Sequence, residues 1–149
     1  MISRHRTSAI CLHQNNILVF KASDPYSNKS YFFLPGGAIE PHETASDCVI
    51  RETFEETGYK VQLLNVPMLT KNYDFYWNNQ TYHCTTEFYL VELAEPYHDP
   101  QSVVDASYNH GPVWVPTVQI DHIFSYQKDI LAAVKELTTQ PLDSFYTPG

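Results

Sequence analysis

Residues 37–59 read GAIEPHETASDCVIRETFEETGY, and they restrict the possible fold more than any other part of the 149-residue sequence. Pro41 excludes an early helix, so the segment is predicted to begin as a loop. Thr44, followed three residues later by Asp47, is typical of a helix N-cap, and Gly58 is a natural C-terminal stop. The segment therefore predicts a loop that leads into a helix between Thr44 and Gly58.

Three acidic side chains fall on one face of this predicted helix. At about 100° per residue, Glu52, Glu55 and Glu56 share a sector roughly 100° wide. Ile50 and Phe54 project from the opposite side and are expected to anchor the helix in the core. Like charges four residues apart, near the C-terminal end of a helix, are unfavourable. A solvated acidic face would tolerate these penalties, but a bound cation explains them better, and grouped carboxylates are typical of Mg²⁺ or Mn²⁺ sites.

The spacing of the segment resembles the Nudix box, Gly-x5-Glu-x7-Arg-Glu-U-x-Glu-Glu-x-Gly-U, in which U is a bulky aliphatic residue. Each fixed position of that signature is filled, by Gly37, Glu43, Arg51, Glu52, Glu55, Glu56 and Gly58. The two U positions differ, since Thr53 and Tyr59 stand there, and this is expected to affect packing more than chemistry. The resemblance implies an α/β fold, the family's α/β/α sandwich with a mixed β-sheet between helices, formed by a single domain over residues 1–149.

The same resemblance implies a metal site. By matching positions, the ligands would be the carboxylates of Glu52, Glu55 and Glu56 and the carbonyl of Gly36. Arg51 and Glu43 would orient the helix and its carboxylates. The bound metal would be Mg²⁺, with Mn²⁺ as the alternative, and it would neutralise the diphosphate and activate a water. Glu55 is the first candidate for the general base.

Hydrolysis of a diphosphate linkage in a small nucleotide derivative is the activity that the resemblance implies. A nucleoside triphosphate cut to a monophosphate and pyrophosphate is favoured over ADP-ribose, another sugar nucleotide or a dinucleoside polyphosphate. A non-catalytic nucleotide-sensing module is the alternative from another class, but such proteins are expected to have lost acids of the box. The formal charge of −8, with only 9 Lys and Arg, argues against a long nucleic acid as partner.

Residues outside the segment supply further candidates. An alternative general base could come from Glu87, Glu92, Glu95, Asp99 or Asp105. Of these, Asp105 lies in the loop before Trp114, a region from which some family members supply an extra carboxylate. His110 could meet the substrate from the same loop. The aromatic residues that could stack on a base are Tyr31, Phe33, Tyr82 and Phe88, although strand aromatics are core residues more often.

Strands and a second helix are predicted around the segment. The strands are expected at residues 7–13, 17–21, 31–34, 61–76, 81–93 and 113–115, with turns at 14–16 and 78–79. A helix over residues 125–137 would bury Ile130, Leu131, Val134 and Leu137. Residues 94–111 are predicted to form a variable loop, and the chain after Thr138 a surface tail.

The composition also predicts the state of the cysteines and the location of the protein. The three cysteines, Cys11, Cys48 and Cys84, are far apart and odd in number, so they are expected to be buried free thiols rather than disulfides or zinc ligands. No run of about 18 apolar residues predicts a membrane span, and no signal peptide is recognisable. A cytoplasmic location follows as the expectation, and the family resemblance adds a possible homodimer.

Overall fold

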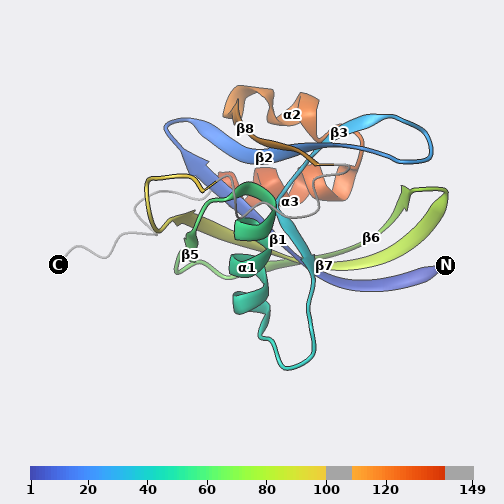
Figure 1. The fold of residues 1–149 in the computed structure, drawn as a ribbon, viewed down its shortest axis with the longest axis horizontal. Coiled ribbons are helices and arrows are strands. Elements are labelled where there is room, and N and C mark those ends of the chain that lie inside the picture. Colours follow the sequence, from blue (N-terminus) through green and yellow to red (C-terminus); the bar gives the residue numbers. More distant parts are fainter. Residues whose placement is uncertain (100–108, 140–149) are drawn as a thin grey trace.

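Strand β1 (Ile2–His13) lies at the centre of the main strand order, between β2 and β7. In the computed structural model, which describes residues 1–99 and 109–139, the main strand order is β3-β2-β1-β7-β5 (Figure 1). The other strands are β2 (Asn16–Ser23), β3 (Ser30–Phe33), β4 (Gly36–Ala38), β5 (Val61–Leu63), β6 (Leu69–Trp77), β7 (Gln80–Leu93) and β8 (Asn109–Pro116). Off the main path, β4 pairs with β1, β6 with β7 and β8 with β2. The sheet is mixed, since β1 and β7 run parallel and the other pairs are antiparallel.

Both tight hairpin turns are built from residues with positive φ. Gln14 and Asn15 have φ of 51° and 64° between β1 and β2, and Asn78 and Asn79 have φ of 51° and 60° between β6 and β7. Two consecutive left-handed residues match the twist of the flanking strands, and asparagine tolerates that conformation. The two predicted turns are therefore confirmed.

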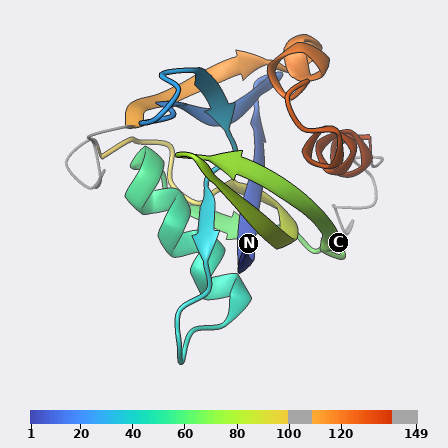
Figure 2. The ribbon, with the colours of Figure 1, turned by 90° about the vertical axis from the view of Figure 1, so that its right-hand side faces the viewer.

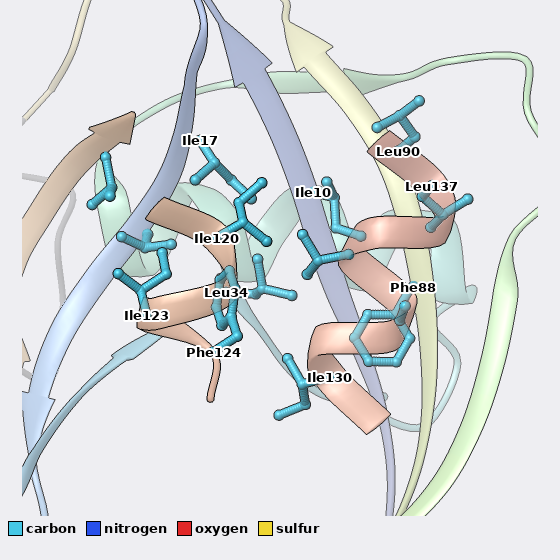
Figure 3. Close-up of a cluster of buried hydrophobic side chains, with 14 of the residues drawn as sticks. Ile10, Ile17, Leu34, Phe88, Leu90, Ile120, Ile123, Phe124, Ile130 and Leu137 are labelled. Atoms are coloured by element: carbon cyan, nitrogen blue, oxygen red, sulfur yellow. The ribbon is translucent and has the colours of Figure 1, made fainter. Parts of the chain in front are cut away.

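Helices cover the sheet on both faces (Figure 2). Helix α1 (Ala45–Thr57) lies on one face, and Val49 packs there with Ala9 and Cys11. On the other face lie η2 (Thr117–Gln119), α2 (Ile120–Ile123) and α3 (Lys128–Thr138). Alternate residues of β1 point to opposite faces, so Ile10 joins the larger cluster, which holds the buried side chains of α2 and α3 (Figure 3). The predicted α/β/α arrangement is confirmed.

Helix α1 has the predicted ends. The side chain of Thr44 accepts a hydrogen bond from the backbone N–H of Asp47 at 3.0 Å. Gly58 has φ of 79°, and its N–H donates to the carbonyl of Phe54 at 2.9 Å. Glycine is favoured in the left-handed conformation just after the last turn of a helix. The residues at both ends of α1 were therefore sufficient to predict where the helix begins and ends.

The buried face of α1 differs from the prediction. Ile50 and Phe54 are only partly buried, whereas Thr53 and Thr57 are fully buried. The threonine hydroxyls donate to the carbonyls four residues earlier, at 2.7 and 2.6 Å, so their burial leaves no polar atom unpaired. The prediction was therefore right only in part: Ile50 packs against the core cluster that contains Val49, but Phe54 does not, and the helix is buried through Cys48, Val49 and the two locally bonded threonines.

Several boundaries also differ. The predicted strand 61–76 is two strands, β5 and β6, separated by residues 64–68, which include Pro67. Strand β4 lies in the predicted loop, and β8 begins earlier than expected, at Asn109. Helix α3 begins at Lys128, after α2, which was not predicted. The predicted surface tail lies mostly outside the described residues. No helix in the described ranges combines the length and the apolar character that a membrane crossing requires.

Candidate active site

Glu56 is the deepest acid of helix α1, and it contacts the glycine-rich strand β4. The backbone N–H of Gly36 donates to Glu56 Oε1 at 2.7 Å. Burial raises the pKa of Glu56 well above its usual value, although the N–H of Gly36 opposes this shift. An ionised carboxylate at this depth would be stabilised by a nearby positive charge.

Arg51 holds three other carboxylates of the site. Its Nε and Nη2 donate to the two carboxylate oxygens of Glu43 at 2.6 and 3.0 Å, a bidentate pair. Its Nη1 donates to Glu52 and to Glu55, at 3.0 Å each. The hydrogen bonds from Arg51 lower the pKa of Glu43 to about 2. Arg51 and Glu43 thus fix the rotamers of the acids beside them.

The two glycines of β4 are explained by what lies against them. A Cβ at Gly37 would lie 2.5 Å from the carboxylate carbon of Glu52. A Cβ at Gly36 would collide with the backbone carbonyl of Thr7 on β1. Gly37 therefore leaves room for a functional side chain, and Gly36 leaves room for the strand pairing of β1 with β4.

We expect the two alanine variants of this pair to separate function from stability. Gly37→Ala should displace the flexible Glu52 side chain and weaken metal binding about 10- to 100-fold, with little change in Tm. Gly36→Ala should lower Tm strongly, because the backbone of Thr7 cannot move without breaking the strand pair. Thermal unfolding and metal titration of both variants check this. Equal Tm losses in the two variants would contradict the assignment.

A cleft of about 460 Å³ opens beside these acids. It is lined by Arg4, Arg6, Phe20, Phe33, Leu34, Gly36, Gly37, Ala38, Glu52, Glu56, Phe75, Trp77, Tyr82 and Cys84. One part is acidic, from Glu52 and Glu56, and another is aromatic. Arg4 lies over the ring of Tyr82, with 4.9 Å between the guanidinium carbon and the ring centroid. Within the described part of the chain, neither Arg4 nor Arg6 forms an ion pair with a carboxylate.

The donor set fits a hard divalent cation. The carboxylates of Glu43, Glu52 and Glu55 share the single guanidinium of Arg51, and burial raises the pKa of Glu52 as well as that of Glu56. Further positive charge is therefore favoured here, and oxygen donors suit Mg²⁺ or Mn²⁺. In residues 1–99 and 109–139, no three Asp, Glu, His or Cys side chains are already arranged to hold an ion. The acids are instead held by Arg51 and by Gly36.

Of the acids in the family signature, only Glu52 and Glu56 line the cleft, while Glu43 and Glu55 lie beside it on Arg51; the described acids outside the signature do not line it either. Glu87 binds His5 at 2.6 Å, Glu92 binds Gln62 at 2.7 Å and Glu95 lies 3.8 Å from Lys60. The backbone of Asp99 donates to the carbonyl of Gly58 at 2.9 Å. Asp105 lies outside the described residues. His110 pairs with Ser23 at 2.9 Å, and it does not line the cleft either.

Two of the four aromatic candidates lie at the cleft, and their stacking on a base stays a prediction. Phe33 and Tyr82 line the cleft, whereas Phe88 is fully buried in the core and was a wrong candidate. Tyr31 packs against Trp77 at 6.4 Å, behind the cleft lining. The polar and aromatic cleft residues that the sequence analysis missed are Arg4, Arg6, Phe20, Phe75 and Trp77. The spacing of two residues puts Arg4 and Arg6 on one strand face, and Phe75 and Trp77 on another, but the sequence did not show that these faces meet.

Comparisons with known proteins agree with the fold. Residues 3–134 match the model of the NUDIX domain. Among solved structures, the chain is similar to a NUDIX hydrolase from Nitrosomonas europaea, with a TM-score of 0.67 and 20% identity over 98% of this chain and 97% of that chain. It is similar to a C. elegans Ap4A hydrolase (TM-score 0.63, 16% identity, 93% and 97% covered). It also resembles an ADP-ribose pyrophosphatase from Streptococcus suis (TM-score 0.58, 18% identity, 92% of each chain covered).

Proposed function

This chain belongs to the NUDIX family, and from that premise we propose that it is a pyrophosphohydrolase whose cleft cuts a nucleotide derivative. The family and the fold predicted from residues 37–59 are confirmed, and the match also supports the prediction of an enzyme. The acids that the family signature requires are all present, so the non-catalytic sensing module has no observation in its favour.

One observation carries the proposal: a single cleft joins the acidic pair Glu52 and Glu56 to a group of aromatic rings. Phosphates would lie at the acidic part, and a flat base would lie against the rings, where stacking is favourable. Arg4 and Arg6 also line the cleft and would bind phosphate oxygens. A cleft of about 460 Å³ falls within the range for small-ligand sites.

Different residues would have different roles in the reaction. A divalent cation held by Glu52, Glu55 and Glu56, with the Gly36 carbonyl as a further ligand, would neutralise the diphosphate and lower the pKa of an attacking water. Arg51 and Glu43 would keep these carboxylates in position. Glu55, whose side chain is 36% exposed, would accept the proton of the water.

A nucleoside triphosphate, cut to a monophosphate and pyrophosphate, is the substrate that we favour. The two arginines in the cleft support it over ADP-ribose and other sugar nucleotides, because a triphosphate carries more charge than one diphosphate bridge. ADP-ribose or another sugar nucleotide and dinucleoside polyphosphates are the alternatives. The similar structures are named for different activities among these, so their common fold does not choose between them.

A substrate panel tests the proposal. The chain is incubated with nucleoside triphosphates, oxidised purine nucleotides, ADP-ribose and dinucleoside polyphosphates, with and without Mg²⁺ or Mn²⁺. Chromatography of the products, with ¹⁸O-labelled water, identifies the bond that is cut. We expect metal-dependent release of a nucleoside monophosphate. Tight nucleotide binding without turnover of any compound would favour the sensing module instead.

Magnesium should stabilise the folded protein more at pH 8 than at pH 6. The raised pKa of Glu56 means that its protonated form stabilises the metal-free fold at low pH, and that this contribution is lost as pH rises. A cation competes with that proton, so its affinity rises with pH. At a Mg²⁺ concentration of 100 times the Kd measured at pH 8, Tm should increase by about 5–10 °C at pH 8 and by less at pH 6. Equal increases in Tm at the two pH values, at that same Mg²⁺ concentration, would contradict this account.

A further inference from the structure

Asp24 joins two hairpins that are not neighbours in the sheet. It follows β2 directly, and only 2% of its surface is exposed. Its Oδ1 accepts hydrogen bonds from the backbone N–H groups of Tyr26 at 2.8 Å and Ser27 at 3.4 Å, which close the loop that leads to β3. The same oxygen accepts from the N–H of Asn78 at 3.1 Å, in the turn between β6 and β7. One buried carboxylate thus ties the tips of both hairpins together.

These two hairpins carry the rings of the cleft. Phe33 lies on β3, whereas Phe75 and Trp77 lie on β6, and β3 and β6 do not pair. The Phe33 ring centroid lies 5.9 Å from that of Phe75 and 5.3 Å from that of Trp77, with nearly perpendicular planes. Trp77 directly precedes Asn78, so the position of its ring depends on where the turn is held.

The charge of Asp24 strengthens the tie. Burial would raise its pKa, but the hydrogen bonds from Tyr26, Asn78 and Ser27 outweigh burial, so the pKa lies below its usual value. An ionised carboxylate is a stronger acceptor than a neutral group. Asp24 does not line the cleft, and any effect on the substrate must pass through the turn at Asn78.

We propose that Asp24 is a positioning residue for the ring-lined part of the cleft: its hydrogen bond to Asn78 holds Trp77 and Phe75 in edge-to-face contact with Phe33, so that these cleft-lining rings stay in place to stack on the flat base of a nucleotide. This inference rests on the proposed function for the identity of the ligand, but it concerns binding of the base and not cleavage. Loss of this hydrogen bond should therefore weaken the binding of ligands that carry a base and leave the binding of ligands without a base unchanged.

Asp24→Ser is the most selective variant. A serine hydroxyl can still close the local turn with Tyr26 or Ser27, but it is too short to reach Asn78. Asp24→Asn keeps an oxygen at the same place and should retain the hydrogen bonds without the charge, so its effect should be much smaller than that of Asp24→Ser. Asp74→Ser is the matched control: Asp74 lies on β6 but binds His83 at 2.9 Å, and it alternates with Phe75, so it faces away from the rings. Like Asp24→Ser, it removes one carboxylate, but from the β6–β7 hairpin itself and without touching the hydrogen bond to Asn78.

Binding is measured by calorimetry with Mg²⁺ present, using AMP, GMP, CMP and UMP as ligands with a base and inorganic pyrophosphate as the ligand without one. Asp24→Ser should raise the Kd of the tightest-binding monophosphate about tenfold, within the contribution of stacking. The Kd of pyrophosphate should stay within twofold, as should all values for Asp24→Asn and Asp74→Ser. The result does not require turnover, so a failure of the proposed activity is distinguished from a failure of this inference.

A second measurement reports on Trp77 without any ligand. In a Trp114→Phe background, Trp77 is the only tryptophan, and acrylamide should quench its fluorescence more in Asp24→Ser than in the parent or in Asp24→Asn. Four results would each overturn the proposal. Asp24→Ser could lose monophosphate and pyrophosphate binding equally, or leave both binding and quenching unchanged. The serine variant could fail to fold, or the parent could bind no monophosphate.

Discussion

Glu56→Gln is expected to lower kcat/KM by about 1,000-fold while leaving the metal-free protein as stable as the parent or more so at pH 8. The loss reflects a missing carboxylate ligand, since a metal contributes several kcal/mol to catalysis and each ~1.4 kcal/mol is tenfold in rate. The gain in stability follows from the burial that raises the pKa of Glu56, because a neutral amide avoids the cost of a buried charge. Its Oε1 can still accept from the N–H of Gly36.

Steady-state kinetics and thermal unfolding with and without Mg²⁺ measure both effects. Glu92→Gln is the matched control, because Glu92 binds Gln62 on the neighbouring strand and does not line the cleft. Parent rates in Glu56→Gln would show that this acid is not part of the metal site. A large loss of Tm without metal would show that its role is structural.

Glu55→Gln should reduce kcat by about 100- to 10,000-fold, the range for loss of a general base. The fold should stay intact, because the side chain is partly exposed and its hydrogen bond from Arg51 can pass to the amide oxygen. Loss of the acidic limb of the pH–rate profile would identify the general base, and a shifted Mg²⁺ dependence would identify the metal ligand. Both changes are expected, because both roles are proposed for Glu55. Parent rates would remove Glu55 from the site.

Glu40→Gln is the control for that variant. Glu40 is exposed, and its carboxylate lies 3.7 Å from the guanidinium of Arg51. It therefore interacts with the same guanidinium without belonging to the family signature. We expect its rates to stay within a few-fold of the parent. A loss as large as that of Glu55→Gln would mean that the charge around Arg51, and not one particular carboxylate, controls turnover.

The local part of the structure could be predicted from the sequence. The ends of α1 and the asparagine turn before β7 depend on residues close together in the chain, so short patterns were enough to predict them. The buried threonines of α1 were missed because hydropathy treats a hydroxyl as polar even when the helix itself satisfies it.

The ring part of the cleft could not be predicted in the same way. Phe75 and Trp77 approach Phe33 only because the hairpin of β6 and β7 folds back toward β3, and no sequence pattern encodes that meeting. Phe88 has the same ring as Phe33 yet lies in the core, since its position on β7 decides which layer it enters. A cytoplasmic location and a homodimer stay predictions.

The parallel pairing of β1 with β7 sets the order in which a newly made chain can fold. Ile2 pairs with Tyr82, eighty positions later, so the first strand leaves the ribosome long before its partner exists. At roughly 5–20 residues per second, that strand waits about 4–16 s with one edge unpaired. We expect slow folding, because strand pairs that are distant in the sequence form late. We also expect the nascent chain to depend on chaperones until β7 emerges.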